Sequence, residues 1–334
     1  MAVGLFGTSA LPVPDAVHLD PAAPVVIDAA GVSWAGVRLE RLDAVFIHGF
    51  RYEDPVLPPA DPACDWSLWQ AGTVIRQQTY STLYSIWARL EQLGGPRLYN
   101  PLSCEVAAFD RLGQLDRLAR AGFPVPPVLA GNDDAAMAAF QRQYEGAGAG
   151  VVWRPVTGRA AWQLFRDRQR RHLVAVDRPP VLLAAVVPGR LLRAYVLDGR
   201  VVLVLATSGP SRDGLERLEA MAPVRDLPPS CLADIGRAVA GLGLRWAVVL
   251  VVVADDAEPP DATDPVFYDI DPDPELGDLP AVFESFLKRA LAAALSGEPL
   301  PEPDFSDAPL ERPALLLRRM LAIQFDIDQT KYAE

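Results

Sequence analysis

The sequence predicts a mixed fold, in which an α/β lobe is followed by α+β lobes. Short β-type runs alternate with helical patterns in the first third of the chain, whereas antiparallel hairpin signals and helices dominate the later part. The length of 334 residues fits two or three compact lobes. Half of the residues are hydrophobic, so a sizeable core can form.

The first third begins with three β-type runs separated by turn-forming residues, at 3–6, 24–28 and 44–47. Residues 51–65 are rich in Pro and Asp, which predicts an exposed loop. From 66 to 93 the apolar residues recur mostly at helical spacing, so we expect one or two helices. Ser103 is the expected N-cap of the next helix, with Asp110 among its early acidic residues.

The remaining elements follow the same logic. We expect an extended segment at 122–127, where prolines bias the preceding residues away from the α conformation. Asp198-Gly199 predicts a two-residue hairpin turn between two strands. Further strands are expected at 151–153, 181–187, 193–197, 201–206, 247–254 and 266–270, and further helices at 114–121, 134–144, 231–242, 279–295 and 315–323.

Charge and cysteine content exclude several classes of function. The net charge of −12 disfavours charge-driven binding to nucleic acid or to an anionic membrane, although a local basic pocket could still hold a small anion. Three cysteines without a CxxC pair favour a reducing compartment over a disulfide framework. The N-terminus has no signal-peptide pattern and the longest apolar run, 246–254, is too short to span a bilayer, so we expect a cytoplasmic protein.

Lysine is almost absent. Of the 31 basic residues only Lys288 and Lys331 are lysines, and the rest are arginines. Codon bias in a GC-rich genome accounts for such a ratio. Whatever its cause, it excludes lysine-dependent chemistry, such as a Schiff base or a P-loop lysine, from the first 287 residues.

Three patterns could carry chemistry. Asp269 and Asp271 lie two positions apart at the end of a predicted strand, so their carboxylates share one face. Two carboxylates placed in this way suit a Mg²⁺ ion that is also bound by phosphates. A solvated acidic turn is the alternative. Arg193 enters the predicted hairpin from a strand and could point into a cleft as an anion ligand, or lie on the surface. Arg154 ends a strand before a small turn and could form part of an anion cradle; an ordinary strand end with no ligand is the alternative. His18, His48 and His172 form no metal-ligand pattern, and His48 is the best candidate for a role beyond structure.

Six motifs follow one another along the chain: Asn100-Pro101, Gly122-Phe-Pro-Val-Pro126, Val151-Val-Trp-Arg154-Pro155, Ala184-Ala-Val-Val-Pro-Gly189, Leu191-Leu-Arg-Ala-Tyr-Val-Leu-Asp-Gly199 and Asp269-Ile-Asp-Pro-Asp-Pro274. In this order they resemble the ATP-grasp superfamily, and within it the ribosomal-protein glutamate ligases and the microviridin-type peptide maturases. The resemblance covers about residues 43–295.

The resemblance implies an ATP-grasp fold with an N-terminal pre-ATP-grasp α/β lobe, and it implies ATP and Mg²⁺ as cofactors. Arg111 and Arg154 stand where the family has lysines that contact ATP phosphates. The backbone of Val186 and Val187 belongs to a hinge that reads adenine. Asp269 and Asp271 would hold the metal, and Arg193 would be the catalytic residue that stabilises the transferring phosphoryl group. The implied domains are 1–102 (pre-ATP-grasp-like), 103–187 (central or lid), 188–297 (C-terminal ATP-grasp) and 298–334 (tail with a helix).

The departures from the family pattern leave two functions open. Both phosphate-contacting lysines are arginines, and the hinge Gln-Glu pair is Ala184-Ala185. The glycine-rich loop that covers the phosphates in the family is the bulkier 157–162, and an acidic ligand is missing from the apolar run 248–253. The chain is therefore either an ATP-dependent carboxylate–amine ligase that acts through an acyl phosphate on a peptide or small molecule, or a silent pseudoenzyme that binds peptides or acts as a scaffold. A homodimer or a partner protein is compatible with both.

Overall fold

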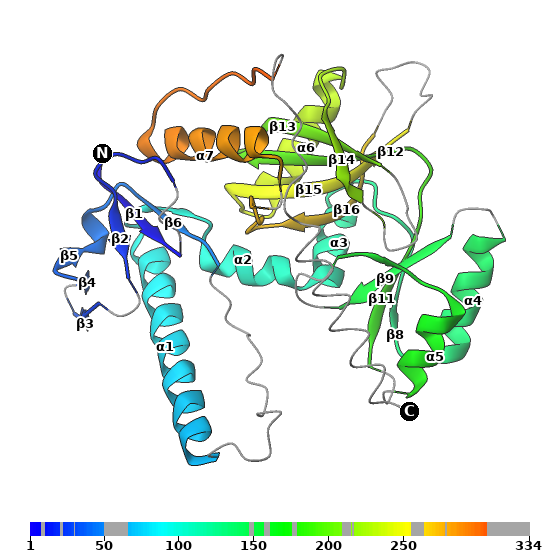
Figure 1. Cartoon of the computed structure of the whole chain (residues 1–334), viewed down its shortest axis with the longest axis horizontal. Coiled ribbons are helices and arrows are strands. Elements are labelled where there is room, and N and C mark those ends of the chain that lie inside the picture. The colour runs from blue at the N-terminus through cyan, green and yellow to red at the C-terminus, as the bar shows by residue number, and fades with distance from the viewer. Residues whose placement is uncertain are drawn as a thin grey trace.

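A computed structural model describes residues 1–7, 11–20, 23–29, 31–49, 66–146, 150–156, 161–175, 179–208, 215, 217–254, 264–277 and 279–305 (Figure 1). The loop expected at 51–65 and the helix expected at 315–323 lie outside these residues, as does most of the predicted phosphate-covering loop. In the part of the chain so described, no helix is long and apolar enough to cross a membrane.

The N-terminal lobe contains a four-stranded parallel sheet and a small antiparallel sheet. In spatial order the parallel strands are β2 (Val17–Leu19), β1 (Val3–Phe6), β6 (Ala44–Ile47) and β7 (Arg97–Tyr99). The small sheet contains β3 (Val25–Asp28), β4 (Gly31–Trp34) and β5 (Val37–Arg38), and a 3-10 turn (Leu39–Arg41) follows it. Strands β2, β4 and β5 were not predicted, because two to four residues carry too little alternation to detect.

A single helix, α1 (Trp66–Leu93), follows this lobe's first strands. Its C-terminal half packs on the lobe, where Trp34 and Trp87 stack with ring centroids 5.7 Å apart and both rings meet Phe6 edge-on. Its N-terminal half extends away from the rest of the molecule (Figure 1).

Helices α2 (Leu102–Phe109) and α3 (Arg111–Arg120) connect this lobe to the next. The prediction that Ser103 caps α2 was wrong, because Ser103 lies inside the helix and the N-cap position is Pro101. The Ser103 N–H donates to the carboxylate of Glu91 on α1, at 3.0 Å. Asp110 is instead the N-cap of α3, and its carboxylate accepts a hydrogen bond from the Gly113 N–H at 3.0 Å. Local capping signals cannot show that a residue from another helix competes for the same donor.

The central lobe is a four-stranded antiparallel sheet covered by two helices. Its strands, in spatial order, are β10 (Gln163–Leu164), β9 (Val151–Pro155), β11 (Val181–Ala185) and β8 (Val128–Gly131). The helices are α4 (Asp134–Glu145) and α5 (Asp167–Ala175). Asp133 caps α4 by accepting hydrogen bonds from two backbone N–H groups, and the helix matches the range expected at 134–144 to within one residue.

The C-terminal lobe is a five-stranded antiparallel sheet between two helices. Its strands, in spatial order, are β14 (Arg217–Pro223), β13 (Arg200–Ser208), β12 (Arg190–Leu197), β15 (Trp246–Val253) and β16 (Val266–Asp271). Asp198 and Gly199 both have positive φ in the turn between β12 and β13, as a type I′ hairpin requires, which confirms the predicted turn.

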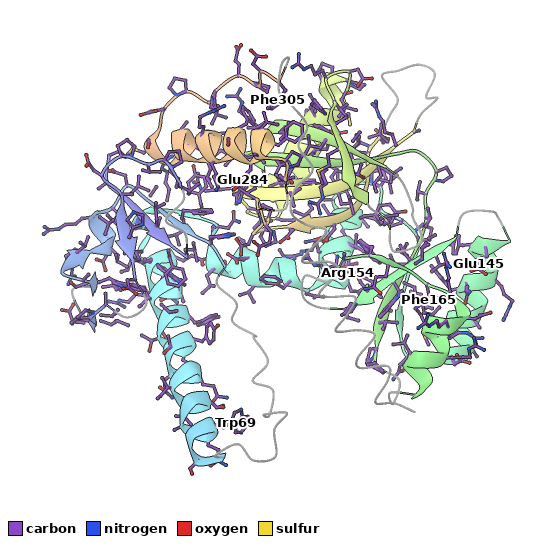
Figure 2. The ribbon with its side chains drawn as sticks, in the orientation of Figure 1. Trp69, Glu145, Arg154, Phe165, Glu284 and Phe305 are labelled. Carbon is purple, nitrogen blue, oxygen red and sulfur yellow. The ribbon has the colours of Figure 1, made fainter. Side chains whose placement is uncertain are left out.

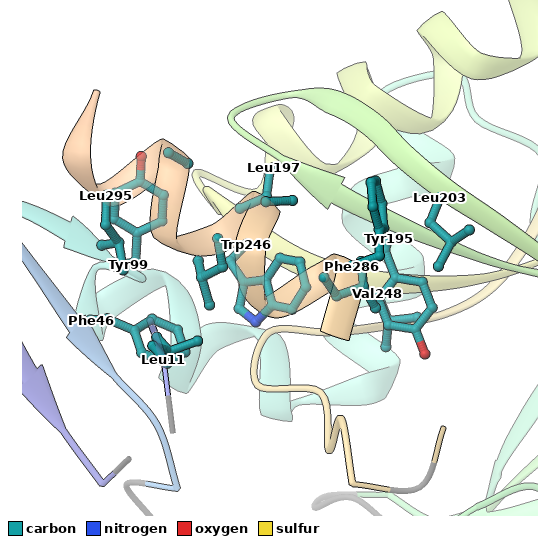
Figure 3. Close-up of a cluster of buried hydrophobic side chains, with 14 of the residues drawn as sticks. Leu11, Phe46, Tyr99, Tyr195, Leu197, Leu203, Trp246, Val248, Phe286 and Leu295 are labelled. Carbon is teal, nitrogen blue, oxygen red and sulfur yellow. The ribbon is translucent and has the colours of Figure 1, made fainter. Parts of the chain in front are cut away.

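Alternate residues of this sheet divide between its two faces. One face packs against α6 (Pro229–Gly241), and part of the other packs against α7 (Ala281–Ser296). Tyr195 and Trp246 belong to the second face, where they lie beside Phe286 of α7 (Figure 3). The remainder of that face, beyond the end of α7, meets the central lobe, and the predicted functional residues lie there.

Candidate functional site

A buried cluster joins the central and C-terminal lobes, and we call it the interlobe seam. It contains side chains from both sheets and from α3: Leu115, Val152, Trp162, Leu182, Ala184, Leu191, Leu215, Leu250, Val252 and Tyr268. Figure 2 shows Arg154 at the base of the central sheet, where the two lobes meet. The predicted hinge, phosphate and metal residues all border this seam.

A β-bulge in β16 shapes one side of the seam. Leu250 of β15 pairs with Asp269, but Val251 pairs with Phe267, so Tyr268 is the additional residue. Phe267 and Ile270 consequently share the face that packs on α6, while Tyr268 packs in the seam beside Asp269. Strict alternation would put Tyr268 on the face opposite Asp269, so periodicity alone does not assign Tyr268 to the site.

Asp269 forms ion pairs with both arginines that were predicted to bind phosphate. Its Oδ1 lies 2.7 Å from Nη1 of Arg111, and its Oδ2 lies 2.6 Å from Nη1 of Arg154. The Asp269 side chain is 18% exposed, and the two arginines are almost completely buried. Burial by itself would raise the pKa of the Asp269 carboxyl, but the positive charges of Arg111 and Arg154 outweigh it and hold that pKa below its usual value. Asp269 is therefore an ionised carboxylate between two guanidinium groups.

Arg111 occupies this position because it is the first residue of α3, directly after the Asp110 cap. Its Nη1 also donates to the carbonyl oxygen of Ile270 at 2.7 Å. Gln114, one turn later, donates to the same carbonyl at 2.8 Å and accepts from the Ile270 N–H at 2.9 Å. The start of α3 thus binds the outer edge of β16, and the Arg111 guanidinium belongs to that contact.

The predicted hinge also has a partner within the chain. The Tyr268 hydroxyl donates to the carbonyl oxygen of Ala185 at 2.6 Å and accepts from the Val187 N–H at 2.7 Å. The Val186 N–H donates to the Gly150 carbonyl oxygen at 3.1 Å. Burial raises the pKa of the Tyr268 phenol well above its ordinary value, so the hydroxyl keeps the proton that it donates.

Trp162 connects the hinge contact to the ion pairs. Its ring meets that of Tyr268 edge-on, with centroids 6.2 Å apart, and the guanidinium carbon of Arg154 lies 5.3 Å from the Trp162 ring centroid. Trp162 is buried, although the loop that contains it was expected to cover phosphates. Sequence reasoning noted only that this loop is bulky, and did not place its tryptophan in the site.

Arg193 and Asp271 border the same region. Arg193 pairs with Leu250, which in turn pairs with Asp269, so Arg193, Leu250 and Asp269 form a row across three strands on one face. Leu250 therefore occupies the middle of this row, within the apolar run where the family's acidic ligand is missing. Asp271 Oδ1 accepts a hydrogen bond from the Asp273 N–H at 3.2 Å.

His48 makes a contact that the sequence did not indicate. It lies directly after β6, where its Nδ1 makes a short contact with Oδ1 of Asp273. The Gly49 N–H donates to the other oxygen of Asp273 at 2.8 Å, and Asp273 is almost fully buried. This contact ties the N-terminal sheet to the segment that follows β16, which favours a structural role for His48.

The described residues do not fit ATP and Mg²⁺ as they are arranged. A metal ion at Asp269 would approach a carboxylate that already contacts two cations, and an adenine would meet hinge groups that already bind Tyr268. Among the residues that the structure covers, no cluster of three or more His, Cys, Asp or Glu side chains could hold a metal. The roles predicted for Arg111, Arg154, Val186, Val187, Arg193, Asp269 and Asp271 stay predictions.

Comparison of the sequence with protein-family models and with curated proteins gives no match. Comparison of the structure with solved structures gives many. The ATP-grasp ligase PsnB, complexed with a minimal precursor, is 17% identical with a TM-score of 0.67, and the match covers 88% of this chain and 98% of that one. The macrocyclase MdnC from Microcystis aeruginosa MRC, bound with the precursor peptide MdnA, is 16% identical with a TM-score of 0.65, over 89% and 100% of the two chains.

A RimK-domain ATP-grasp protein from Sphaerobacter thermophilus DSM 20745 is also similar, at 18% identity and a TM-score of 0.53, over 90% of this chain and 100% of that one. Identities this low establish a shared fold. The fold agrees with the architecture that the sequence motifs implied, because helices and sheets are mixed and the matches span nearly the whole of each solved chain. The chain therefore has the ATP-grasp fold, with structural similarity to peptide-modifying ligases and to a RimK-domain protein of that fold.

Proposed function

We propose that this protein is a peptide-binding pseudoenzyme of the ATP-grasp fold, which acts as a binding or scaffold subunit without using ATP. One observation carries the proposal: Asp269 forms ion pairs with Arg111 and Arg154 at the same time. Three of the residues that would have to bind metal and phosphate thus form ion pairs with one another inside the seam.

Electrostatics favour keeping Asp269 paired with Arg111 and Arg154. Two nearly buried guanidinium groups without a counter-charge would be costly, and so would a buried carboxylate without a partner. A nucleotide would have to bring its own negative charge to both arginines while Mg²⁺ replaced them at Asp269. Arginine also offers several donors in a rigid planar group, so it makes a more directional contact to a carboxylate than lysine does.

The peptide ligand is proposed from the solved structures. PsnB was crystallised with a minimal precursor and with the precursor peptide PsnA2, and MdnC with the peptide MdnA. The match extends over almost the full length of those chains, so this protein has the same lobes available to hold a peptide. In the proposed function, peptide binding is retained and nucleotide binding is lost.

The second candidate is the ATP-dependent carboxylate–amine ligase. The observation that favours it is the convergence of three arginines on one point, because Arg111, Arg154 and Arg193 all act electrostatically on Asp269. An arginine cluster of this kind could stabilise phosphoryl or acyl-phosphate charge if Asp269 moved away from it. This candidate requires ATP to displace both the Asp269 ion pairs and the Tyr268 hinge contact.

Thermal unfolding with Mg-ATP separates the two candidates. A ligand at about 100 times its Kd stabilises a folded protein by about 2.7 kcal/mol. The pseudoenzyme proposal predicts no change in melting temperature at millimolar Mg-ATP or Mn-ATP, and no ADP release. A saturable rise in melting temperature together with peptide-dependent ADP release would establish the ligase instead.

Peptide binding is tested separately, by fluorescence anisotropy. The probes are labelled synthetic peptides translated from short reading frames beside the gene. We expect at least one to bind saturably, with an affinity that neither ATP nor a metal chelator changes. A scrambled peptide of equal composition is the control. If no encoded peptide binds more tightly than its scrambled form, the peptide-binding part of the proposal fails.

A further inference from the structure

We infer that Tyr268 is a built-in occupant of the base-binding end of the interlobe seam, where its hydroxyl makes the two hydrogen bonds that a purine edge would make. The inference rests on the proposed loss of nucleotide binding and identifies the residue that blocks the base. It predicts a closed subsite for a flat heteroaromatic ring with a donor beside an acceptor.

The hydrogen bonds define the chemistry of the subsite. The Ala185 carbonyl needs a donor, and the Val187 N–H, two residues later on the same segment, needs an acceptor. The edge of adenine presents an amino donor next to a ring-nitrogen acceptor, which is the complementary pair. A hydroxyl is a single group with one donor and available lone pairs, so the Tyr268 oxygen satisfies both hinge groups at once.

The surroundings of the ring define its shape. The Tyr268 side chain is 1% exposed and lies in the interlobe seam, between apolar residues of the central sheet, such as Leu182 and Ala184, and of the C-terminal sheet, such as Leu191. Trp162 meets the ring edge-on. The phenol thus fills an apolar space between two sheets, with its polar end at the hinge, in the manner of a bound aromatic ligand.

The bulge in β16 explains how this one side chain reaches the hinge. It places Tyr268 in the seam beside Asp269, which forms ion pairs with the predicted phosphate-binding arginines. Adjacent residues of one strand therefore close both ends of the predicted nucleotide site. Removing the Tyr268 side chain should open the base end alone, because that side chain takes no part in the Asp269 ion pairs.

The test compares three substitutions. Tyr268→Ala and Tyr268→Leu remove the ring and free the hinge groups, whereas Tyr268→Phe removes only the hydroxyl and leaves the space filled. With adenosine as the probe and uridine as the control, we expect the melting temperatures of the Ala and Leu variants to rise saturably with adenosine only. The native protein and the Phe variant should not respond. ATP should bind the opened variants no more tightly than adenosine does.

The failures are distinguishable. If native protein binds Mg-ATP, the proposed function fails. If Mg-ATP does not change the melting temperature of the native protein, and millimolar adenosine does not change that of a folded Ala or Leu variant, only the present inference fails. Should neither variant fold, hydrogen exchange decides: the Val187 amide of folded Tyr268→Phe should exchange at least about tenfold faster than in native protein. An unchanged exchange rate would overturn the hinge contact.

Discussion

Asp269 is the carboxylate at which the positive charges of Arg111, Arg154 and Arg193 meet. The sequence placed it at the end of a strand, facing a site with Arg111, Arg154 and Arg193, and the structure brings these residues together. The expected ligands of the arginines were phosphates, whereas in the structure their partner is the carboxylate itself. Opposite charges that are buried together pair with each other when nothing else is bound.

Asp269→Asn should destabilise the protein by about 3–5 kcal/mol, because it leaves two nearly buried guanidinium groups without a counter-charge. Urea unfolding at neutral pH measures the loss. Asp226→Asn is the control, since it removes the carboxylate from an exposed pair with Arg190 and should have little effect. Equal effects of the two substitutions would contradict the buried cluster.

The same carboxylate predicts a pH dependence. Because the folded-state pKa of Asp269 is depressed, its contribution to stability is complete above the ordinary aspartate pKa of about 4 and is lost as the pH falls below it. Native protein should therefore lose more stability than Asp269→Asn between neutral pH and about pH 3. Parallel acid profiles for the two proteins would rule out this contribution.

Cys231 offers a second test at the residue scale. Burial, reinforced by the negative charges of Asp234 and Asp264, raises the pKa of its thiol to about 11. At about pH 8 it should thus be almost wholly protonated and should react with iodoacetamide at least about tenfold more slowly in native protein than in guanidinium chloride. Peptide mapping by mass spectrometry follows the site, with the less buried Cys104 as the internal comparison. Native labelling of Cys231 as fast as that of Cys104 would contradict the packing around α6.

At the scale of elements, most helices and the long strands were predictable, because they carry strong periodicity and clear turn signals. Several elements lie close to the expected ranges: the strands β12, β13 and β15, the hairpin between the first two, and the helices α4 and α7. The bulge in β16 was not predictable. It depends on how β15 pairs with β16, and no residue in 266–271 marks it.

Helix α6 packs on the β12–β13 hairpin through a glycine. A Cβ atom on Gly236 would lie 2.0 Å from the carbonyl oxygen of Gly199 in the turn. Gly236→Ala should therefore push the helix from the hairpin and destabilise the protein by about 1–3 kcal/mol. Gly241→Ala, at the end of the same helix with open space at its Cβ position, should be neutral or slightly stabilising. Equal melting temperatures for the two variants would contradict this contact.

A few buried polar contacts add to the apolar clusters that join the lobes of the molecule. Asn100, almost fully buried after β7, donates to the carbonyl oxygens of Trp246 and Pro272 and accepts from the backbone N–H groups of Arg245 and Trp246. In the sequence, Asn100-Pro101 is only one of the motifs that carry the family resemblance. The structure makes this residue a link between the N-terminal lobe and the neighbouring ends of β15 and β16.

Asn100→Ala should cost at least about 3 kcal/mol, since it leaves four backbone groups in a buried region without their partner. Urea unfolding followed by both fluorescence and circular dichroism measures this, and we expect the two probes to separate as the lobes lose their coupling. Asn132→Ala, on the surface before α4, is the control. Coincident transitions with native stability would exclude the linking role.

The sequence by itself determined the fold class, most of the elements and some of the residues that border the interlobe seam. Hydrophobic periodicity, caps and turn residues act over a few positions, so they can be read along the chain. Only the tertiary structure decided what those residues bind. Two choices depend on side chains more than 70 positions apart that meet when the lobes pack. One is whether Arg111 and Arg154 bind a phosphate or Asp269. The other is whether the hinge forms hydrogen bonds with a base or with Tyr268. Buried charges and hydrogen-bonding groups require partners, and folding selects those within reach.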